Sequence, residues 1–223
     1  MRSLAQPKVL TSAMTAALFS ALASCPRLLV WDNRPYVLWF YEAILFLCGI
    51  VLWAFVFAWH TKYSHRPVFT LRPGSMALAV ATVSALLLAV VLHRWLDPVL
   101  RTVTPEEYPK TLQRWIALVL WTLSYLQLFL IFAPFAWCLR LFQHTGMAAT
   151  LTILFGVFVM VLKDHSSAVP APWGLFGAML VTRLAVGTLS IYLYLRGGVI
   201  LVWWWGLLVQ SRHLWTIEYE SNQ

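Results

Sequence analysis

Seven apolar runs, separated by short polar or proline-containing connections, dominate this 223-residue sequence. A bilayer core about 30 Å thick needs about 20 apolar residues per helical crossing, and a backbone in lipid satisfies its hydrogen bonds only in helices or closed barrels. The runs lack the alternation of a barrel strand. The sequence therefore predicts an all-α, polytopic helical membrane bundle with six to seven transmembrane helices, over about residues 9–24, 36–59, 76–95, 114–136, 147–162, 173–195 and 199–214.

Charged residues are few and scattered along the chain. Only 11% of the residues are charged and 61% are hydrophobic, whereas about 25% of a soluble domain is charged. The short connections leave no room for a soluble domain, so residues 1–223 are predicted to form a single transmembrane domain. The net charge of +8 is spread over many loops, which favours lipid headgroups over nucleic acid as its partner. We expect a multi-pass protein of a bacterial inner or cell membrane.

The first apolar run follows basic residues, as the apolar part of a signal peptide does. We expect it to be retained as a helix, because another membrane span follows directly. The segment Cys25-Pro26-Arg27 is expected to end this helix and turn the chain, because the position before a proline disfavours helical geometry.

Glu42 and Arg183 are charged side chains well inside predicted spans, where a charge is costly unless it is paired or faces a polar interior. Glu42 lies near the start of the second span and is expected to be an interfacial acid paired with Arg34 or Arg27. Arg183 lies about ten residues into the sixth span, so it is expected to face the bundle and to find an acid, carbonyl groups or water. Convergence of Glu42 and Arg183 in one wet pocket would indicate an enzyme.

The stretch from Ala133 to Gln143 interrupts an apolar run with a proline and an arginine. Pro134 lacks a backbone N–H and is expected to bend the helix. The bend frees backbone groups, which neighbouring helices or Arg140 must satisfy. This stretch is therefore the place where a site within the membrane is expected.

The segment Ala89-Val-Val-Leu-His93 resembles the Ala-x-x-x-His pattern with which light-harvesting helices ligate bacteriochlorophyll. His93 is therefore a candidate ligand for a hydrophobic cofactor, and a pigment, haem or quinone would use His93 or His60 together with the tryptophans. A histidine beside Arg94 at a helix end is also typical of an interfacial position. No metal site is predicted, because no pair of candidate ligands has the i, i+4 spacing of a shared helix face.

Three stretches follow one another in the second half of the chain: Ala133-Pro-Phe-Ala136, then Leu151-Thr-Ile-Leu-Phe155, then Gly187 leading to Tyr194-Leu-Arg-Gly-Gly198. This order resembles the CAAX-protease and bacteriocin-processing (CPBP) family of intramembrane proteases. That family places Glu-Glu-x-x-x-Arg after a comparable break, Phe-x-x-x-His in the next helix, and a glycine-rich stretch before His-x-x-x-Asn. The resemblance implies a bundle of six to eight helices.

The family's catalytic residues are replaced at every corresponding position. The glutamates, arginine, two histidines and asparagine of the motifs fall on Trp137, Cys138, Phe142, Val159, Leu207 and Ser211. The chemistry needs a carboxylate to activate water and imidazoles to hold a metal or an oxyanion, and these side chains supply neither. The resemblance therefore implies a pseudoprotease, in which Trp137 is expected to fill the space that carboxylates occupy in family enzymes.

These observations favour a non-catalytic membrane subunit that assembles or stabilises a larger complex with other membrane proteins. The 13 Trp and 13 Phe residues provide large faces for protein or lipid contact. Two alternatives stay open: an intramembrane protease or other membrane enzyme with a divergent site, and a subunit that binds a hydrophobic cofactor.

Overall fold

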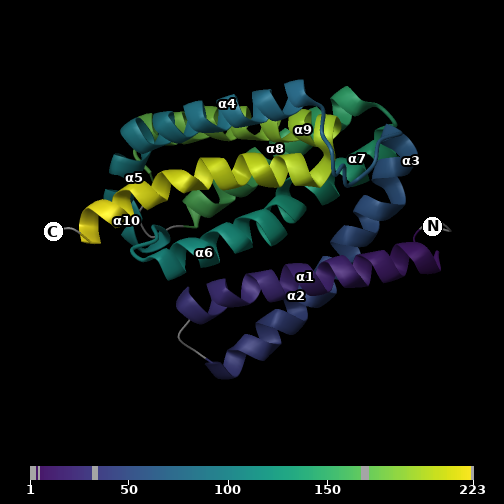
Figure 1. Ribbon diagram of the computed structural model, residues 1–223, viewed down its shortest axis with the longest axis horizontal. Coiled ribbons are helices and arrows are strands. Elements are labelled where there is room, and N and C mark those ends of the chain that lie inside the picture. The colour runs from purple at the N-terminus through teal and green to yellow at the C-terminus, as the bar shows by residue number, and fades with distance from the viewer. Residues whose placement is uncertain (1–3, 5, 32–34, 167–170, 222–223) are drawn as a thin grey trace.

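The computed structural model describes residues 4, 6–31, 35–166 and 171–221, and this part of the chain is almost entirely helical (Figure 1). The main helices are α1 (Pro7–Trp31), α2 (Pro35–Phe55), α4 (Ser75–Val91), α6 (Leu112–Trp121), α7 (Ala133–Phe142), α8 (Thr145–His165) and α9 (Trp173–Gln210). The shorter helices are α3 (Thr61–Ser64), α5 (Asp97–Val103) and α10 (Leu214–Ser221), with 3-10 turns η3 (Pro105–Glu107) and η6 (Ser211–His213). The prediction of an all-α bundle is confirmed.

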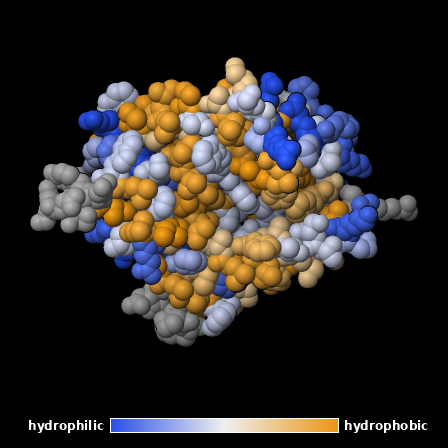
Figure 2. Space-filling model, in the orientation of Figure 1, coloured by the Kyte–Doolittle hydropathy of each residue, from blue (hydrophilic) through white to orange (hydrophobic). Residues whose placement is uncertain are grey.

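Six helical segments in the described part of the chain are long and apolar enough to cross a membrane. They are Pro7–Val30, Val37–Ser64, Ser75–Val103, Leu112–Phe142, Thr145–His165 and Trp173–Ile217. In the face that Figure 2 shows, hydrophobic residues cover much of the middle of the molecule, and the most hydrophilic ones gather mainly towards the ends of the helices. The protein is therefore a multi-pass membrane protein.

The last of these segments contains a break at Gly198, which has φ 66° and ψ −163°. A straight helix over its 45 residues would be about 68 Å long at about 1.5 Å per residue, more than twice the bilayer core. The Val199 N–H donates to the Val68 carbonyl oxygen at 2.9 Å, so the loop before α4 closes over the break. The two halves of α9 then fold back on each other, and the second continues towards α10 (Figure 1).

Small residues bring the helices close together. Ala13 and Ala17 of α1 are fully buried, and an added Cβ on Gly49 of α2 would lie only 3.2 Å from the Ala17 Cβ. Ala81 and Ala85 are buried in α4. Close backbone approach through small residues is the usual basis of helix association in lipid, where no hydrophobic driving force acts between helices.

The first helix is longer than the sequence predicts. α1 runs through Pro26 and ends only at Trp31, so the prediction that Cys25-Pro26-Arg27 ends the helix and turns the chain is wrong. A proline is tolerated inside a membrane helix because neighbouring helices and local adjustments satisfy the carbonyl group that loses its partner. Residues 32–34, which include Arg34, lie outside the described residues.

Among the described residues, π-helical turns interrupt the spans at η1 (Val56–His60), η2 (Leu92–Leu96), η4 (Thr122–Leu126) and η5 (Leu128–Phe132). Such turns are rare and frequently mark functional sites. Here η1 and η4 border a large groove, and η2, η4 and η5 border a polar cavity. The irregular turns therefore indicate where the candidate sites lie.

Candidate functional site

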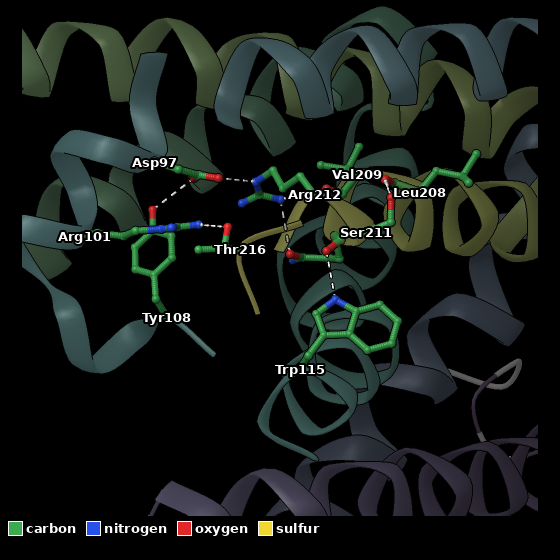
Figure 3. Close-up of polar contacts among 10 residues, drawn as sticks. Asp97, Arg101, Tyr108, Trp115, Leu208, Val209, Ser211, Arg212 and Thr216 are labelled. Atoms are coloured by element: carbon green, nitrogen blue, oxygen red, sulfur yellow. Dashed lines mark hydrogen bonds and ion pairs between the residues drawn. The ribbon is translucent and has the colours of Figure 1, made fainter. Parts of the chain in front are cut away.

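A polar network built on Asp97 closes one end of the bundle (Figure 3). Asp97 begins α5 and is only 1% exposed. Its Oδ2 accepts from Nε of Arg212 in η6 at 3.0 Å, and its Oδ1 accepts from the Tyr108 hydroxyl at 3.1 Å. Burial, and then the neighbouring Asp97 charge, raise the pKa of Tyr108. The carboxylate thus joins the start of α5 to the nearby Tyr108 and to Arg212, which lies 115 residues further along the chain.

Further hydrogen bonds tie this network to the surrounding helices. Nη1 of Arg212 donates to the Val209 carbonyl at 2.9 Å and to Oε1 of Gln210 at 3.2 Å. The Trp115 indole N–H donates to the Gln210 carbonyl at 2.9 Å, and Arg101 donates to the Thr216 hydroxyl. Asp97 connects α5 to Arg212 of η6, and Trp115 connects α6 to the end of α9. Together these hydrogen bonds form a clamp between α5, η6 and α6.

Sequence reasoning singled out Glu42 and Arg183 but missed both Asp97 and Arg212. The signal was present as an acid at the end of the third apolar run and an arginine at the end of the last one. Nothing in the sequence paired these ends. Their pairing follows from the hairpin at Gly198, which returns the last span to the end of the bundle where α5 lies.

His93 lies in η2, beside the Asp97 network. Its ring meets the Trp215 ring edge to face, with the centroids 5.2 Å apart, and its Nδ1 is buried without a hydrogen-bond partner among the described residues. His213 packs against Tyr108 with centroids 5.4 Å apart. No group of three or more His, Cys, Asp or Glu side chains in the described part of the chain could hold a metal ion. His93 therefore stays a candidate ligand of a hydrophobic cofactor only.

Pro134 lies in the first turn of α7, immediately after the π turn η5. A π turn accommodates the missing N–H, because it already shifts the backbone hydrogen-bonding pattern. The Arg140 guanidinium lies over the Trp59 ring, with its central carbon 4.4 Å from the ring centroid. This distance is typical of a cation–π interaction.

Trp137 lies at the surface of the bend. It is 42% exposed, and its ring lies 5.0 Å from Phe55 and 5.5 Å from Trp59. Trp137 therefore packs against two aromatic rings and is partly open to the surroundings of the bundle. An exposed, edge-packed indole is typical of a position facing lipid or a neighbouring protein.

Glu42 and Arg183 do not converge. The Glu42 carboxyl group lies within hydrogen-bonding reach of the Cys25 thiol on α1, whereas the Arg183 guanidinium packs on Gly156 of α8. α1 and α2 form one side of the molecule, and α8 and the first half of α9 lie on the other (Figure 1). The shared pocket that an enzyme built on these two residues requires is not formed.

His60 is fully buried at the end of η1. Its ring centroid lies 4.4 Å from that of Tyr194, which is 1% exposed. Neither ring nitrogen of His60 nor the Tyr194 hydroxyl has a hydrogen-bond partner among the described residues. His60 therefore belongs to the core between η1 and α9, and is not among the residues that line the groove of about 870 Å³.

A groove of about 870 Å³ lies between α1 and the neighbouring spans. Aromatic rings line much of it, with hydroxyl groups between them: Phe19, Trp53, Phe57, Phe69 and Trp203, and Thr11, Ser12, Thr15, Ser20 and Ser124. Phe19, at 68% exposed, lies at its mouth. A groove of this size and lining is typical of a site for a small hydrophobic molecule.

Trp53 organises the wall of the groove. Its indole N–H donates to the Ser20 hydroxyl of α1 at 3.0 Å, and its ring stacks on Phe57 and Phe69 at centroid distances of 5.5 and 6.0 Å. The Trp203 indole N–H is buried without a hydrogen-bond partner in the described residues. The wall of the groove therefore combines aromatic faces with a buried indole N–H that lacks a partner among the described residues.

Comparison with protein families, with curated proteins and with solved structures found no match to this chain. The fold and the groove define its class, a multi-pass helical membrane protein with an aromatic groove between its spans.

Proposed function

We propose that this protein is a non-catalytic membrane subunit that binds a small hydrophobic molecule in the groove between α1, η1, η4 and the second half of α9. The groove of about 870 Å³ carries this proposal. Ligand sites of about 300–1,000 Å³ with aromatic walls and a few polar groups are the rule for small molecules. A flat ring bearing carbonyl oxygens, as in a quinone, matches the stacked rings of Trp53 and Phe69 and the free Trp203 N–H.

The non-catalytic part of the proposal is supported by the side chains at the bend. Trp137 and Cys138 stand where the CPBP resemblance would require two glutamates. Trp137 lies at the surface, and Cys138 lies beside Thr152 of α8. We propose on the same resemblance that the chain is a degenerate member of the CPBP scaffold, in a bacterial inner or cell membrane.

Other membrane subunits are the proposed partners. Trp39, Phe40 and Trp95 are 78%, 64% and 73% exposed, and they provide aromatic contact area away from the groove. Such area suits both lipid and a neighbouring protein. Purification in mild detergent followed by mass measurement tests this part, and a protein that is recovered alone and as a monomer would contradict it.

Ligand binding is tested with a long-chain benzoquinone added to the purified protein. We expect quenching of tryptophan fluorescence that saturates, because Trp53 and Trp203 line the groove. Ala16→Phe places a ring inside the groove and should abolish saturable quenching. Ala43→Phe adds the same ring to an exposed position of α2 and should leave it unchanged.

Trp203→Phe tests the contribution of the Trp203 indole to the groove. This variant keeps an aromatic ring but removes the unpartnered N–H together with part of the indole ring system, so we expect weaker quinone binding with the fold retained. Equal binding by wild type and Ala16→Phe would overturn the proposed site. Absorption spectroscopy of the purified protein tests for pigment or haem, since both are coloured.

A further inference from the structure

A second cavity, of about 210 Å³, lies between the two halves of α9 and the π turns η2, η4 and η5. It shares no lining residue with the aromatic groove. Its polar lining consists of Thr122, Gln127, Arg183, Ser190, Gln210 and Arg212. Polar side chains at this depth in a membrane protein normally mark a pathway or a binding site.

Several polar atoms around this cavity have no hydrogen-bond partner among the described residues. They are Nη2 of Arg183, Nε1 of Trp205 and Oε1 of Gln127. Trp205 and Gln127 are only 2% and 8% exposed, so bulk water does not reach them freely. Buried polar groups are nearly always hydrogen-bonded in native proteins, and two unpaired N–H donors beside one cavity indicate that a bound group with acceptor oxygens completes them.

The charges around the cavity favour an anion. Arg212 is neutralised by Asp97 at 3.0 Å, whereas the guanidinium of Arg183 makes no ion pair in the described part of the chain and lies against Gly156. A guanidinium in a low-dielectric site binds phosphate and carboxylate groups through parallel N–H donors. The cavity therefore carries one positive charge that the described carboxylates leave uncompensated.

A neighbouring cavity provides the route to it. This cavity, of about 320 Å³, shares Thr122, Leu126, Gln210 and Arg212 with the first one. Glu107, Lys163 and Asp164 line it at the loop end. There the Lys163 ammonium pairs with Glu107 at 2.6 Å, and Oδ1 of Asp164 accepts from the Ala171 N–H at 3.0 Å. Lys163 thus neutralises the Glu107 charge, and the Asp164 carboxylate is held by a backbone hydrogen bond.

We propose that the Arg183 cavity binds a phosphate group, which enters from the end of the bundle that carries Lys163 and Tyr108. A tetrahedral phosphate offers acceptor oxygens in several directions, and the donors come from different directions as well, from both halves of α9. The group belongs either to free phosphate or to the headgroup of an anionic lipid. Both sources present the same chemistry to Arg183.

The test measures phosphate binding by the purified, delipidated full-length protein. One arm uses radiolabelled inorganic phosphate in detergent, and the other uses nanodiscs that contain phosphatidic acid, with phosphatidylcholine nanodiscs as reference. We expect saturable binding in at least one arm. Saturation by inorganic phosphate assigns the site to the free anion, and retention of phosphatidic acid alone assigns it to a lipid headgroup.

Three variants test whether phosphate binding depends on the Arg183 guanidinium. Arg183→Gln removes the charge and should weaken binding at least tenfold. Gly156→Ala keeps the charge but places a Cβ 2.6 Å from Nη2 of Arg183, which displaces the head and should weaken binding similarly. Gly177→Ala, whose Cβ would meet nothing within 4 Å, should bind like wild type.

The result that overturns the proposal is equal binding by wild type and Gly156→Ala, or no saturable binding in either arm. If Arg183→Gln does not fold, Arg183→Lys replaces it as the second variant. Lysine keeps the charge and loses the planar fork, so binding should fall by less than with Gly156→Ala. A melting curve for each variant separates lost binding from lost structure. A negative result for phosphate leaves the quinone assay unaffected, because the two sites share no lining residue.

Discussion

Replacing Asp97 by asparagine tests whether the clamp in Figure 3 holds the end of the bundle together. The change keeps the shape of the side chain and removes its charge, so Arg212 is left 13% exposed without a counter-ion. At 3.0 Å and an effective dielectric constant of about 20, the attraction is about 5 kcal/mol. The cost of desolvating both groups offsets part of it, and breaking one partner of a buried pair costs about 3–5 kcal/mol. We expect a loss of about 3 kcal/mol.

The matched control is Glu107→Gln. Glu107 pairs with Lys163 at the shorter distance of 2.6 Å, but these side chains are 43% and 64% exposed. Water and salt screen such a pair, and its contribution is about 0–1 kcal/mol. The two substitutions make the same chemical change, so burial alone predicts the difference between them.

Unfolding in mixed micelles with increasing SDS, followed by tryptophan fluorescence, gives the free energy of unfolding of each variant. The reasoning is refuted if Asp97→Asn loses no more stability than Glu107→Gln. The double variant Asp97→Asn/Arg212→Met supplies a second check. It should be more stable than Asp97→Asn alone, because it removes the buried charge that the single change leaves unpaired.

Other changes test the break, the bend and the network. Gly198→Ala should lower the free energy of unfolding by more than about 3 kcal/mol, because its φ of 66° is a glycine conformation and the new Cβ would lie 2.4 Å from a backbone oxygen. Gly174→Ala, whose Cβ would meet nothing within 4 Å, should be neutral in the same SDS titration. Trp137→Ala should cost about 1–2 kcal/mol, less than truncation of a buried aromatic, and should change no proteolysis of a membrane peptide. Thermal melts of the wild-type protein should show a loss of stability at alkaline pH, and Tyr108→Phe should reduce that loss. The folded pKa of Tyr108 is raised, so its contribution is present below about pH 10, the unfolded value, and is lost as the pH rises towards the folded value.

The spans themselves were predictable from the sequence. Uninterrupted apolar runs admit only helices in lipid, and the glycines before Val199 permit the reversal that divides the last run. The end of the first helix was not predictable, because a proline breaks a helix in water but is tolerated when neighbouring helices satisfy the freed carbonyl group. Pro26 is such a case.

The candidate sites were only partly predictable. The cost of a charge in lipid predicted that Arg183 faces the bundle, and it does border a polar cavity. The same cost could not predict which residues surround Arg183. Glu42, the other charged residue well inside a span, lies on α2, on the other side of the molecule. The groove was invisible in the sequence, because its tryptophans and serines come from helices whose relative positions no local pattern specifies.

By itself, the sequence determined that this chain is a multi-pass helical membrane protein, because apolar length and backbone hydrogen bonding leave no other solution in a bilayer. Only the tertiary structure decided which polar groups meet. Asp97 finds Arg212 because the chain reverses at Gly198 and brings back a segment that lies 115 residues further along. Packing of small residues sets how closely the helices approach, and that spacing leaves the aromatic groove and the Arg183 cavity between them.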